Sequence, residues 1–167
     1  MENLGWQSLS TGPVWVVIGA VFVAALGSIG SAIALGRTTS HSAGVLSEKP
    51  ELFGKLLILM ALPGTQGFYA FIIAYLMLQK FGFTSSNPEA SLGQGVAMLL
   101  TGIVIGVVQF RSALSQGQSA VGSIDLTGKR PEESGRAILL PGLVEMYAVL
   151  AFLVAFLVIL WVGGKAF

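Results

Sequence analysis

The chain has 167 residues, of which 54% are hydrophobic and only 10% are charged, with a mean hydropathy of +0.81 and a formal net charge of +1. Charged residues make up about a quarter of a soluble domain, so this composition excludes a soluble globular protein. The small net charge argues against nucleic acid as a partner, and the lack of cysteine excludes disulfide frameworks. We therefore expect an all-α membrane protein that forms a single transmembrane domain over residues 1–167.

Four apolar stretches follow one another along the chain, and each is long enough to cross a membrane as a helix. Only helices or closed barrels satisfy the backbone in lipid, and stretches of this length without alternation indicate helices. The four predicted spans cover residues 13–35, 52–79, 92–115 and 137–162. We expect the connecting segments, residues 36–51, 80–91 and 116–136, to be loops.

The chain also contains an internal duplication. Lys-Pro-Glu at 49–51 recurs as Arg-Pro-Glu at 130–132, an offset of 81 residues. The two halves are therefore predicted to be helical hairpins of the same orientation, over residues 13–80 and 92–162. Gly64 in the first hairpin is the counterpart of Glu145 in the second, so only the second hairpin is expected to carry a carboxylate.

The basic residues predict the orientation in the membrane. Seven of the nine flank the first and third loops, whereas the middle loop and the C-terminus hold one each. By the positive-inside rule, segments 36–51 and 116–136 face the cytoplasm and both termini face outside. The first loop is flanked by Arg37, Lys49 and Lys55, and the third loop by Arg111, Lys129, Arg130 and Arg136. The middle loop has Lys80, and the C-terminus has Lys165.

Small residues are concentrated in the first span and indicate close helix packing, because they let helix backbones approach one another in lipid. This pattern is compatible with a tight four-helix monomer. It is also compatible with a homo-oligomer in which the first span forms the crowded inner layer and the bulkier second and fourth spans face lipid.

Glu145 is the one charged residue deep inside an apolar run, residues 139–150. A charge at the centre of a membrane helix costs about 3 kcal/mol on insertion scales, so such residues usually serve an ion, a proton or a counter-charge. We therefore take Glu145 as the candidate ion-carrying carboxylate.

Polar positions in two other spans are expected at the depth of Glu145. Leu62, Thr65, Gln66 and Tyr69 fall on one face of the second span, and the proline after Leu62 distorts the backbone and can free its carbonyl as a ligand. At a rise of about 1.5 Å per residue, Gln109 of the third span is estimated to lie in the same layer.

These groups supply one carboxylate together with amide, hydroxyl and carbonyl oxygens, a set that suits a hard monovalent cation. Ca²⁺ normally recruits more carboxylates, and Mg²⁺ retains several waters. Tyr69 is expected to orient Glu145 through a hydrogen bond rather than to bind the ion. A proton site needs little more than the acid, so the set favours Na⁺. The glutamines can alternatively serve only as hydrogen bonds between helices.

These residues give the chain a family resemblance. It resembles the 16-kDa-type proteolipids that form the rotor ring of V-type ATPases, and in particular the K subunits of bacterial Na⁺-translocating V-type ATPases. The resemblance covers nearly the whole length. Its most specific features are Leu-Pro-Gly-Thr-Gln-Gly at 62–67, Gln109, and Val-Glu-Met-Tyr at 144–147.

The resemblance implies a homo-oligomeric ring of identical copies in the lipid of a bacterial plasma membrane. A stator membrane subunit would supply an arginine, and a central stalk would dock on the cytoplasmic loops. It also implies a supporting hydrogen bond from Tyr69. The Na⁺ ligands that it implies are Leu62, Thr65, Gln66, Gln109 and Glu145.

The resemblance makes the chain part of a translocating ATPase, while ATP hydrolysis is expected in partner subunits because the sequence contains no Gly-x-x-x-x-Gly-Lys-Ser/Thr motif. The nearest alternative is the same rotor run on protons. A small four-helix cation or multidrug exchanger is a further alternative, which the duplication and the Thr-Gln-Gln set disfavour. A purely structural four-span protein is another, but it would not need an acid in the middle of a helix.

Overall fold

The computed structural model describes residues 10–85 and 87–164, and all regular elements within them are helical. Four segments of this part are long and apolar enough to cross a membrane, which confirms the predicted all-α, four-span fold. The elements are α1 (Gly12–Glu48), η2 (Pro50–Leu52), α2 (Phe53–Ala61), η3 (Leu62–Gly64), α3 (Thr65–Lys80), η4 (Phe83–Ser85), α4 (Leu92–Lys129), η5 (Pro131–Glu133), α5 (Ser134–Ala137) and α6 (Leu139–Gly163).

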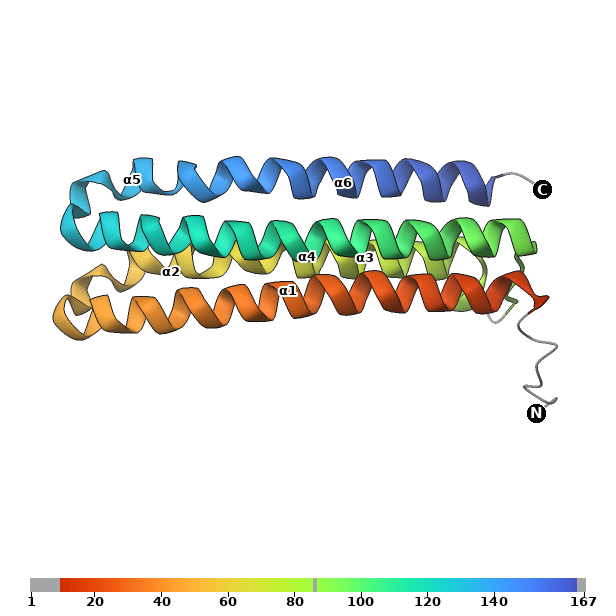
Figure 1. Cartoon of the computed structure of the whole chain (residues 1–167), viewed down its shortest axis with the longest axis horizontal. Helices are drawn as coiled ribbons and strands as arrows, with labels where there is room; N and C mark the ends of the chain where they lie inside the picture. The colour runs from red at the N-terminus through yellow and green to blue at the C-terminus, as the bar shows by residue number, and fades with distance from the viewer. Residues whose placement is uncertain (1–9, 86, 165–167) are drawn as a thin grey trace.

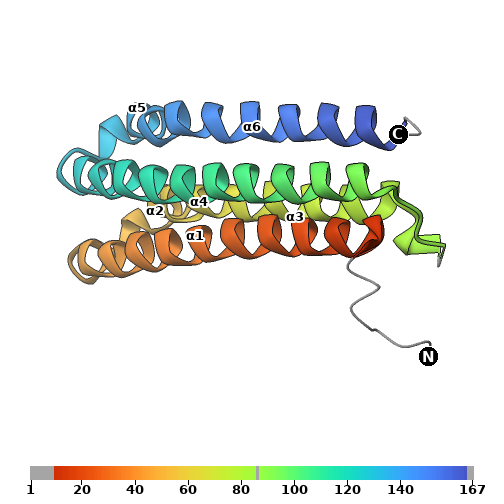
Figure 2. The same ribbon diagram turned by 45° about the vertical axis from the view of Figure 1, so that its right-hand side comes forward.

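The two hairpins lie side by side in the same orientation. In both ribbon views α1 and α4 run in parallel, and the chain returns through α2 and α3 in the first hairpin and through α5 and α6 in the second (Figures 1 and 2). The short helices η2 and η5 form the turns at one end of the bundle. The connection from α3 to α4 lies at the other end, as do the two ends of the described chain.

Glycine positions bring α1 and α4 into backbone contact. Gly12 and Gly19 of α1 lie against the backbone at Gly95 and Gly102 of α4. A Cβ atom on Gly19 would lie 2.8 Å from the carbonyl carbon of Met98, so no larger residue fits there without moving a helix. The small residues of the first span therefore pack against the third, and these two helices form the most extensive interface of the chain.

Both inner helices are longer than the apolar stretches that predicted them. Segments 36–51 and 116–136 were expected to be loops, but α1 continues to Glu48 and α4 to Lys129. The prediction was wrong because hydropathy measures the apolar length and not the helix length. The polar extensions pack against the returning helices instead: the Thr38 hydroxyl donates to the Met60 carbonyl at 3.0 Å, and Ser123 donates to that of Ala137 at 2.8 Å.

The returning helix of the first hairpin changes geometry at Pro63. The 3₁₀ turn η3 separates α2 from α3, as expected for a proline, which has no N–H and crowds the preceding turn. Ser31 of α1 supports the first turn of α3, because its hydroxyl accepts the backbone N–H of Gly67 at 2.9 Å. The break determines where the polar face of α3 begins.

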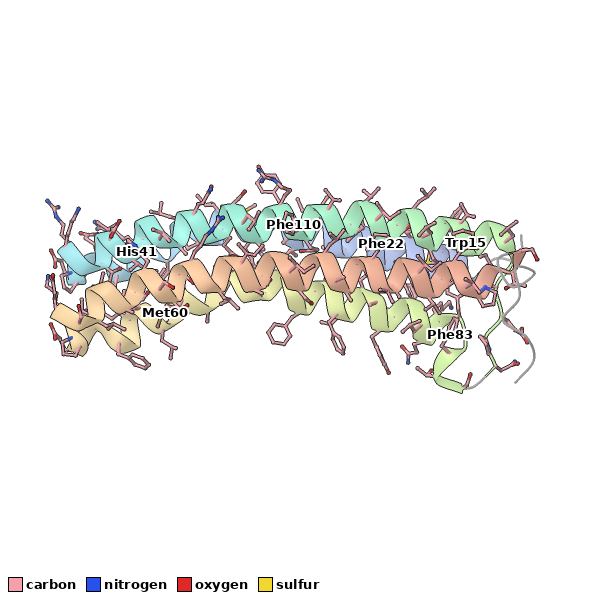
Figure 3. The ribbon with its side chains drawn as sticks, turned by 60° about the horizontal axis from the view of Figure 1, so that its bottom comes forward. Trp15, Phe22, His41, Met60, Phe83 and Phe110 are labelled. Atoms are coloured by element: carbon pink, nitrogen blue, oxygen red, sulfur yellow. The ribbon has the colours of Figure 1, made fainter. Side chains whose placement is uncertain are left out.

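Two apolar clusters occupy the ends of the bundle and leave a polar layer between them. One cluster includes Val16, Ile73 and Met98, and the other includes Met60 and Ile124. Figure 3 shows Trp15 and Phe83 towards the end of the bundle where α3 connects to α4, and His41 and Met60 towards the end where the hairpins turn. Three fully buried glutamines lie between the clusters: Gln66, Gln109 and Gln116.

Candidate ion-binding site

The Glu145 carboxylate lies on α6, half-buried, and is held by side chains of α3 and α4. The Tyr69 hydroxyl donates to Oε1 at 2.7 Å. Oε2 accepts from the Thr65 hydroxyl at 2.8 Å and from the Gln116 amide at 2.5 Å. One carboxylate oxygen therefore faces the tyrosine, and the other faces a polar cluster.

Oxygen atoms converge on the Thr65 hydroxyl at the start of α3. Its Oγ1 lies 2.9 Å from the Leu62 carbonyl oxygen, 2.8 Å from Glu145 Oε2 and 3.4 Å from Gln66 Oε1. A hydroxyl has a single hydrogen to donate, so it can satisfy only one of these three acceptors at a time. The 3₁₀ turn η3 creates this arrangement by placing the Leu62 carbonyl beside the first side chain of α3.

Gln66 and Gln116 connect the inner and outer helices around the site. Gln66 Nε2 donates to Gln116 Oε1 at 2.7 Å and to the Ser112 hydroxyl at 3.4 Å. Gln116 Nε2 also donates to the Pro141 carbonyl at 3.1 Å. Both glutamines are fully buried, and a buried polar network of this kind is stabilising only when its members are paired.

Gln109 does not belong to this cluster. It lies two helical turns before Gln116 on α4, and its Nε2 donates to the Ala148 carbonyl at 3.0 Å. Its Oε1 is buried without a hydrogen-bond partner. The structure therefore places Gln109 at the Ala148 carbonyl, one turn along α6 from Glu145, and not in the hydrogen-bonded cluster at the carboxylate. The sequence predicted that the third span ends at residue 115, so Gln116 was assigned to a loop. In the structure, both glutamines lie on one face of a continuous helix.

The structure brings the other predicted site residues together. Tyr69, Thr65 and Leu62 lie at the carboxylate or one hydrogen bond away from it, and Gln66 is linked to it through Thr65 and Gln116. The Tyr69 ring also packs on Phe152 of α6, with centroids 5.6 Å apart. Gln116 is the residue that the sequence reasoning missed.

The arrangement provides one formal negative charge among neutral oxygen atoms. Within the described residues, no three His, Cys, Asp or Glu side chains gather as a metal-binding group. A divalent ion such as Ca²⁺ normally recruits several carboxylates, whereas one carboxylate with carbonyl, amide and hydroxyl oxygens fits a monovalent cation.

Comparison with known proteins finds one family model that matches this chain twice, in agreement with the internal repeat. The family model for the C subunit of ATP synthase matches residues 18–77 and again residues 99–158. The matches begin at residues 18 and 99, so they are displaced by 81 residues, the offset of the internal repeat. The duplication expected from the sequence is thereby confirmed.

Two relatives match most of the chain. The chain is 35% identical to the V-type sodium ATPase subunit K of Enterococcus hirae over 149 residues, which cover 89% of this chain and 92% of the relative. It is 32% identical to the A-type ATP synthase subunit K of Methanocaldococcus jannaschii over 145 residues, which cover 87% of this chain and 61% of that protein.

Proposed function

Because the chain belongs to the ATP synthase C family, as a rotor proteolipid of the V/A type, we propose that it binds Na⁺ at Glu145 and carries it through the membrane. The similarity to a protein named as a sodium ATPase subunit supports Na⁺ as the cargo. The chain thereby contributes the transport step of an ATPase complex, and partner subunits hydrolyse ATP.

The observation that carries this proposal is the convergence of oxygen atoms on Thr65 Oγ1. A Leu62 carbonyl, a Gln66 amide oxygen and a Glu145 carboxylate oxygen surround one hydroxyl that has a single proton. A cation satisfies all of these oxygens at once, whereas a proton on the carboxylate satisfies only one more acceptor. The ligand set that we propose is Leu62, Thr65, Gln66, Gln116 and Glu145.

Gln116 takes the place that the sequence reasoning assigned to Gln109. In the structure its Nε2 faces Glu145 and its Oε1 faces Gln66. A half-turn about the last side-chain torsion exchanges Nε2 and Oε1 and presents Oε1 to the ion. The hydrogen bonds of Gln116 with Gln66 and with the Pro141 carbonyl are then given up, and Gln66 Nε2 retains the Ser112 hydroxyl as an acceptor. Tyr69 remains bonded to the other carboxylate oxygen and keeps Oε2 directed at the ion.

Binding of one Na⁺ neutralises the single charge of the site. A neutral pair crosses the lipid at far lower cost than a bare carboxylate. Glu145 is half-buried between α3, α4 and α6, which gives a partner subunit access to it. We propose that a stator arginine displaces the ion there, while identical copies in a ring turn with a central stalk.

The membrane orientation proposed from the basic residues places the hairpin turns in the cytoplasm of a bacterium. Arg37, Lys49, Lys55, Lys129, Arg130 and Arg136 all lie in the half of the molecule that contains these turns, and Lys80 lies at the opposite end. Lys165 and residues 1–9 fall outside the described part of the chain. The stalk would therefore dock on the ends of the long inner helices and not on extended loops.

Carbodiimide labelling tests the proposal. The reagent should modify Glu145 in the purified protein, and Na⁺ should slow the modification at neutral pH more strongly than K⁺, with Li⁺ as the second test cation. Glu145→Gln should remove the labelling altogether. Labelling that is indifferent to Na⁺ but sensitive to pH would overturn the Na⁺ assignment and favour a proton-driven rotor.

A further inference from the structure

The first hairpin caps the end of the second hairpin's inner helix. Lys49 Nζ donates to the Gly128 carbonyl at 2.6 Å, and Lys55 Nζ donates to the Pro131 carbonyl at 2.9 Å. Gly128 lies in the last turn of α4, where carbonyls have no partner within the helix and a nearby cation is favourable. Pro131 is the first residue of η5, and its carbonyl also accepts the Ser134 N–H. Two lysines thus join the halves of the chain where the hairpins turn.

The internal repeat supplies a second set of the same groups. At the offset of 81 residues, Arg130 corresponds to Lys49, and Ser47 corresponds to Gly128. Lys49 is half-buried and Gly128 is buried, whereas both counterparts are exposed. Within the described residues, the Arg130 guanidinium has no hydrogen-bond or ion-pair partner. The groups that form the contact between the two halves therefore occur a second time, as Arg130 and Ser47, and this second pair is not joined within the chain. We call the exposed surfaces that carry these two residues the outer edges of the chain.

We propose that these outer edges meet between neighbouring copies of the chain, with Arg130 of one copy donating to the Ser47 carbonyl of the next. By the same offset, Arg136 is the counterpart of Lys55, and Pro50 is that of Pro131. Arg136 of one copy should therefore donate to the Pro50 carbonyl of the next. The Arg136 guanidinium contacts Glu133 at 3.2 Å and is largely exposed, and its five N–H donors leave capacity for a second acceptor. This inference depends on the proposed function for one assumption only, which is that copies of the chain pack side by side in a ring.

The inner-helix faces that this pairing requires are exposed. Leu100 is the repeat counterpart of Gly19 and Val21 is that of Gly102, and their exposed fractions are 57% and 61%. In the chain, the two glycines bring the backbones of α1 and α4 into contact. Leu100 and Val21 prevent such an approach, so the inner helices of adjacent copies lie further apart than α1 and α4 do. Arginine, which is longer than lysine, suits the wider gap.

Cysteine cross-linking tests the pairing directly, because the native sequence contains no cysteine. A Cβ atom on Gly128 would lie 3.9 Å from Val45 Cβ, which is within the range of a disulfide. Val45→Cys with Gly128→Cys should therefore form a bond within one chain. The repeat counterparts, Leu126→Cys with Ser47→Cys, should join different chains when treated with a short bifunctional maleimide.

The expected result is a ladder of joined copies for the Leu126/Ser47 pair and none for either single variant or for the internal pair. Assemblies that remain intact on a native gel without joined copies from the Leu126/Ser47 pair would overturn the inference. The carbodiimide assay separates this failure from a failure of the proposed function. Na⁺ protection without the ladder leaves the function standing, and a ladder without Na⁺ protection leaves the pairing standing.

Thermal dissociation tests the arginine itself. Arg130→Gln should lower the temperature at which detergent-solubilised assemblies separate into single chains, with the helix content unchanged, and Arg130→Lys should lower it less. Lys129→Gln is the matched control, because Lys129 is a neighbouring base without an assigned carbonyl. Equal dissociation temperatures for Arg130→Gln, Lys129→Gln and the parent would rule out the proposed bond.

Discussion

Gln116 on α4 donates to Glu145 on α6 across 2.5 Å, which links an inner helix to an outer helix at the carboxylate. A hydrogen bond to a charged group contributes about 1.5–3 kcal/mol. The same amide bonds the Pro141 carbonyl, so it holds α6 at two successive turns. The position of the carboxylate along the bundle is therefore set by α4 as well as by its own helix.

The two glutamines of α4 should differ in their effect on Na⁺ binding. Gln116→Ala removes a proposed ligand that contacts Glu145, so the Na⁺ affinity should fall about 10-fold or more, at about 1.4 kcal/mol per tenfold. Gln109→Ala removes a bond to the Ala148 carbonyl and should lower stability without a comparable loss of affinity. The Na⁺ concentration that halves the carbodiimide labelling rate measures both.

A variant that keeps the shape of Gln109 provides the control for this pair. Gln109→Leu fills nearly the same space and removes the buried amide, so the protein should fold and keep its Na⁺ affinity. A large loss of affinity in Gln109→Leu, together with a normal affinity in Gln116→Ala, would restore the ligand set first expected from the sequence.

Local patterns predicted the parts of the site that lie within one helix. Leu62, Thr65 and Tyr69 are separated by three and four residues, so helix geometry alone places them on one face. Glu145 was found because a charge in an apolar run is costly. The repeat then placed the second and fourth spans in the same orientation, which brought Thr65 and Glu145 to a similar depth.

The position of α4 relative to α6 could not be predicted from the same patterns. Hydropathy ended the third span near residue 115 and left Gln116 outside it, whereas the helix continues to Lys129. Register between helices depends on backbone contacts such as that of Gly19 with Gly102, and no single-span pattern records them. The same limitation concealed the bond between Lys49 and the Gly128 carbonyl.

Tyr69→Phe should remove a hydrogen bond to Glu145 without removing a proposed ion ligand. The Tyr69 hydroxyl donates to Oε1 at 2.7 Å, and its loss leaves one carboxylate oxygen without that donor. We expect the Na⁺ affinity to fall by roughly 3- to 30-fold, because a bond to a charged group is worth about 1.5–3 kcal/mol and the half-buried carboxylate can recover part of it by relaxing. Equilibrium ²²Na⁺ binding measures this, and an unchanged affinity would show that Tyr69 only packs on Phe152.

Gly102→Leu should disrupt the inner pair of helices. A Cβ atom at this position would lie 2.6 Å from the Gly19 carbonyl carbon, so the helices must separate, at a cost of about 1–3 kcal/mol or more. Gly54→Ala is the control, because its side chain would meet no atom within 4 Å and alanine favours a helix by about 1 kcal/mol. Thermal unfolding followed by circular dichroism should show a lower midpoint for Gly102→Leu only.

Thr65 offers the sharpest test of whether the converging oxygens bind a cation. Thr65→Val preserves the branched shape and removes the hydroxyl around which the Leu62, Gln66 and Glu145 oxygens gather. A proposed Na⁺ ligand and a bond to a charged group are lost together, so the affinity should fall about 10- to 100-fold, by about 1.5–3 kcal/mol. Thr65→Ser keeps the hydroxyl and should bind Na⁺ nearly as well as the parent in the same ²²Na⁺ assay. If the valine and serine variants bind Na⁺ equally, the hydroxyl is only a hydrogen-bond donor to Glu145, and the cation does not sit where these oxygens converge.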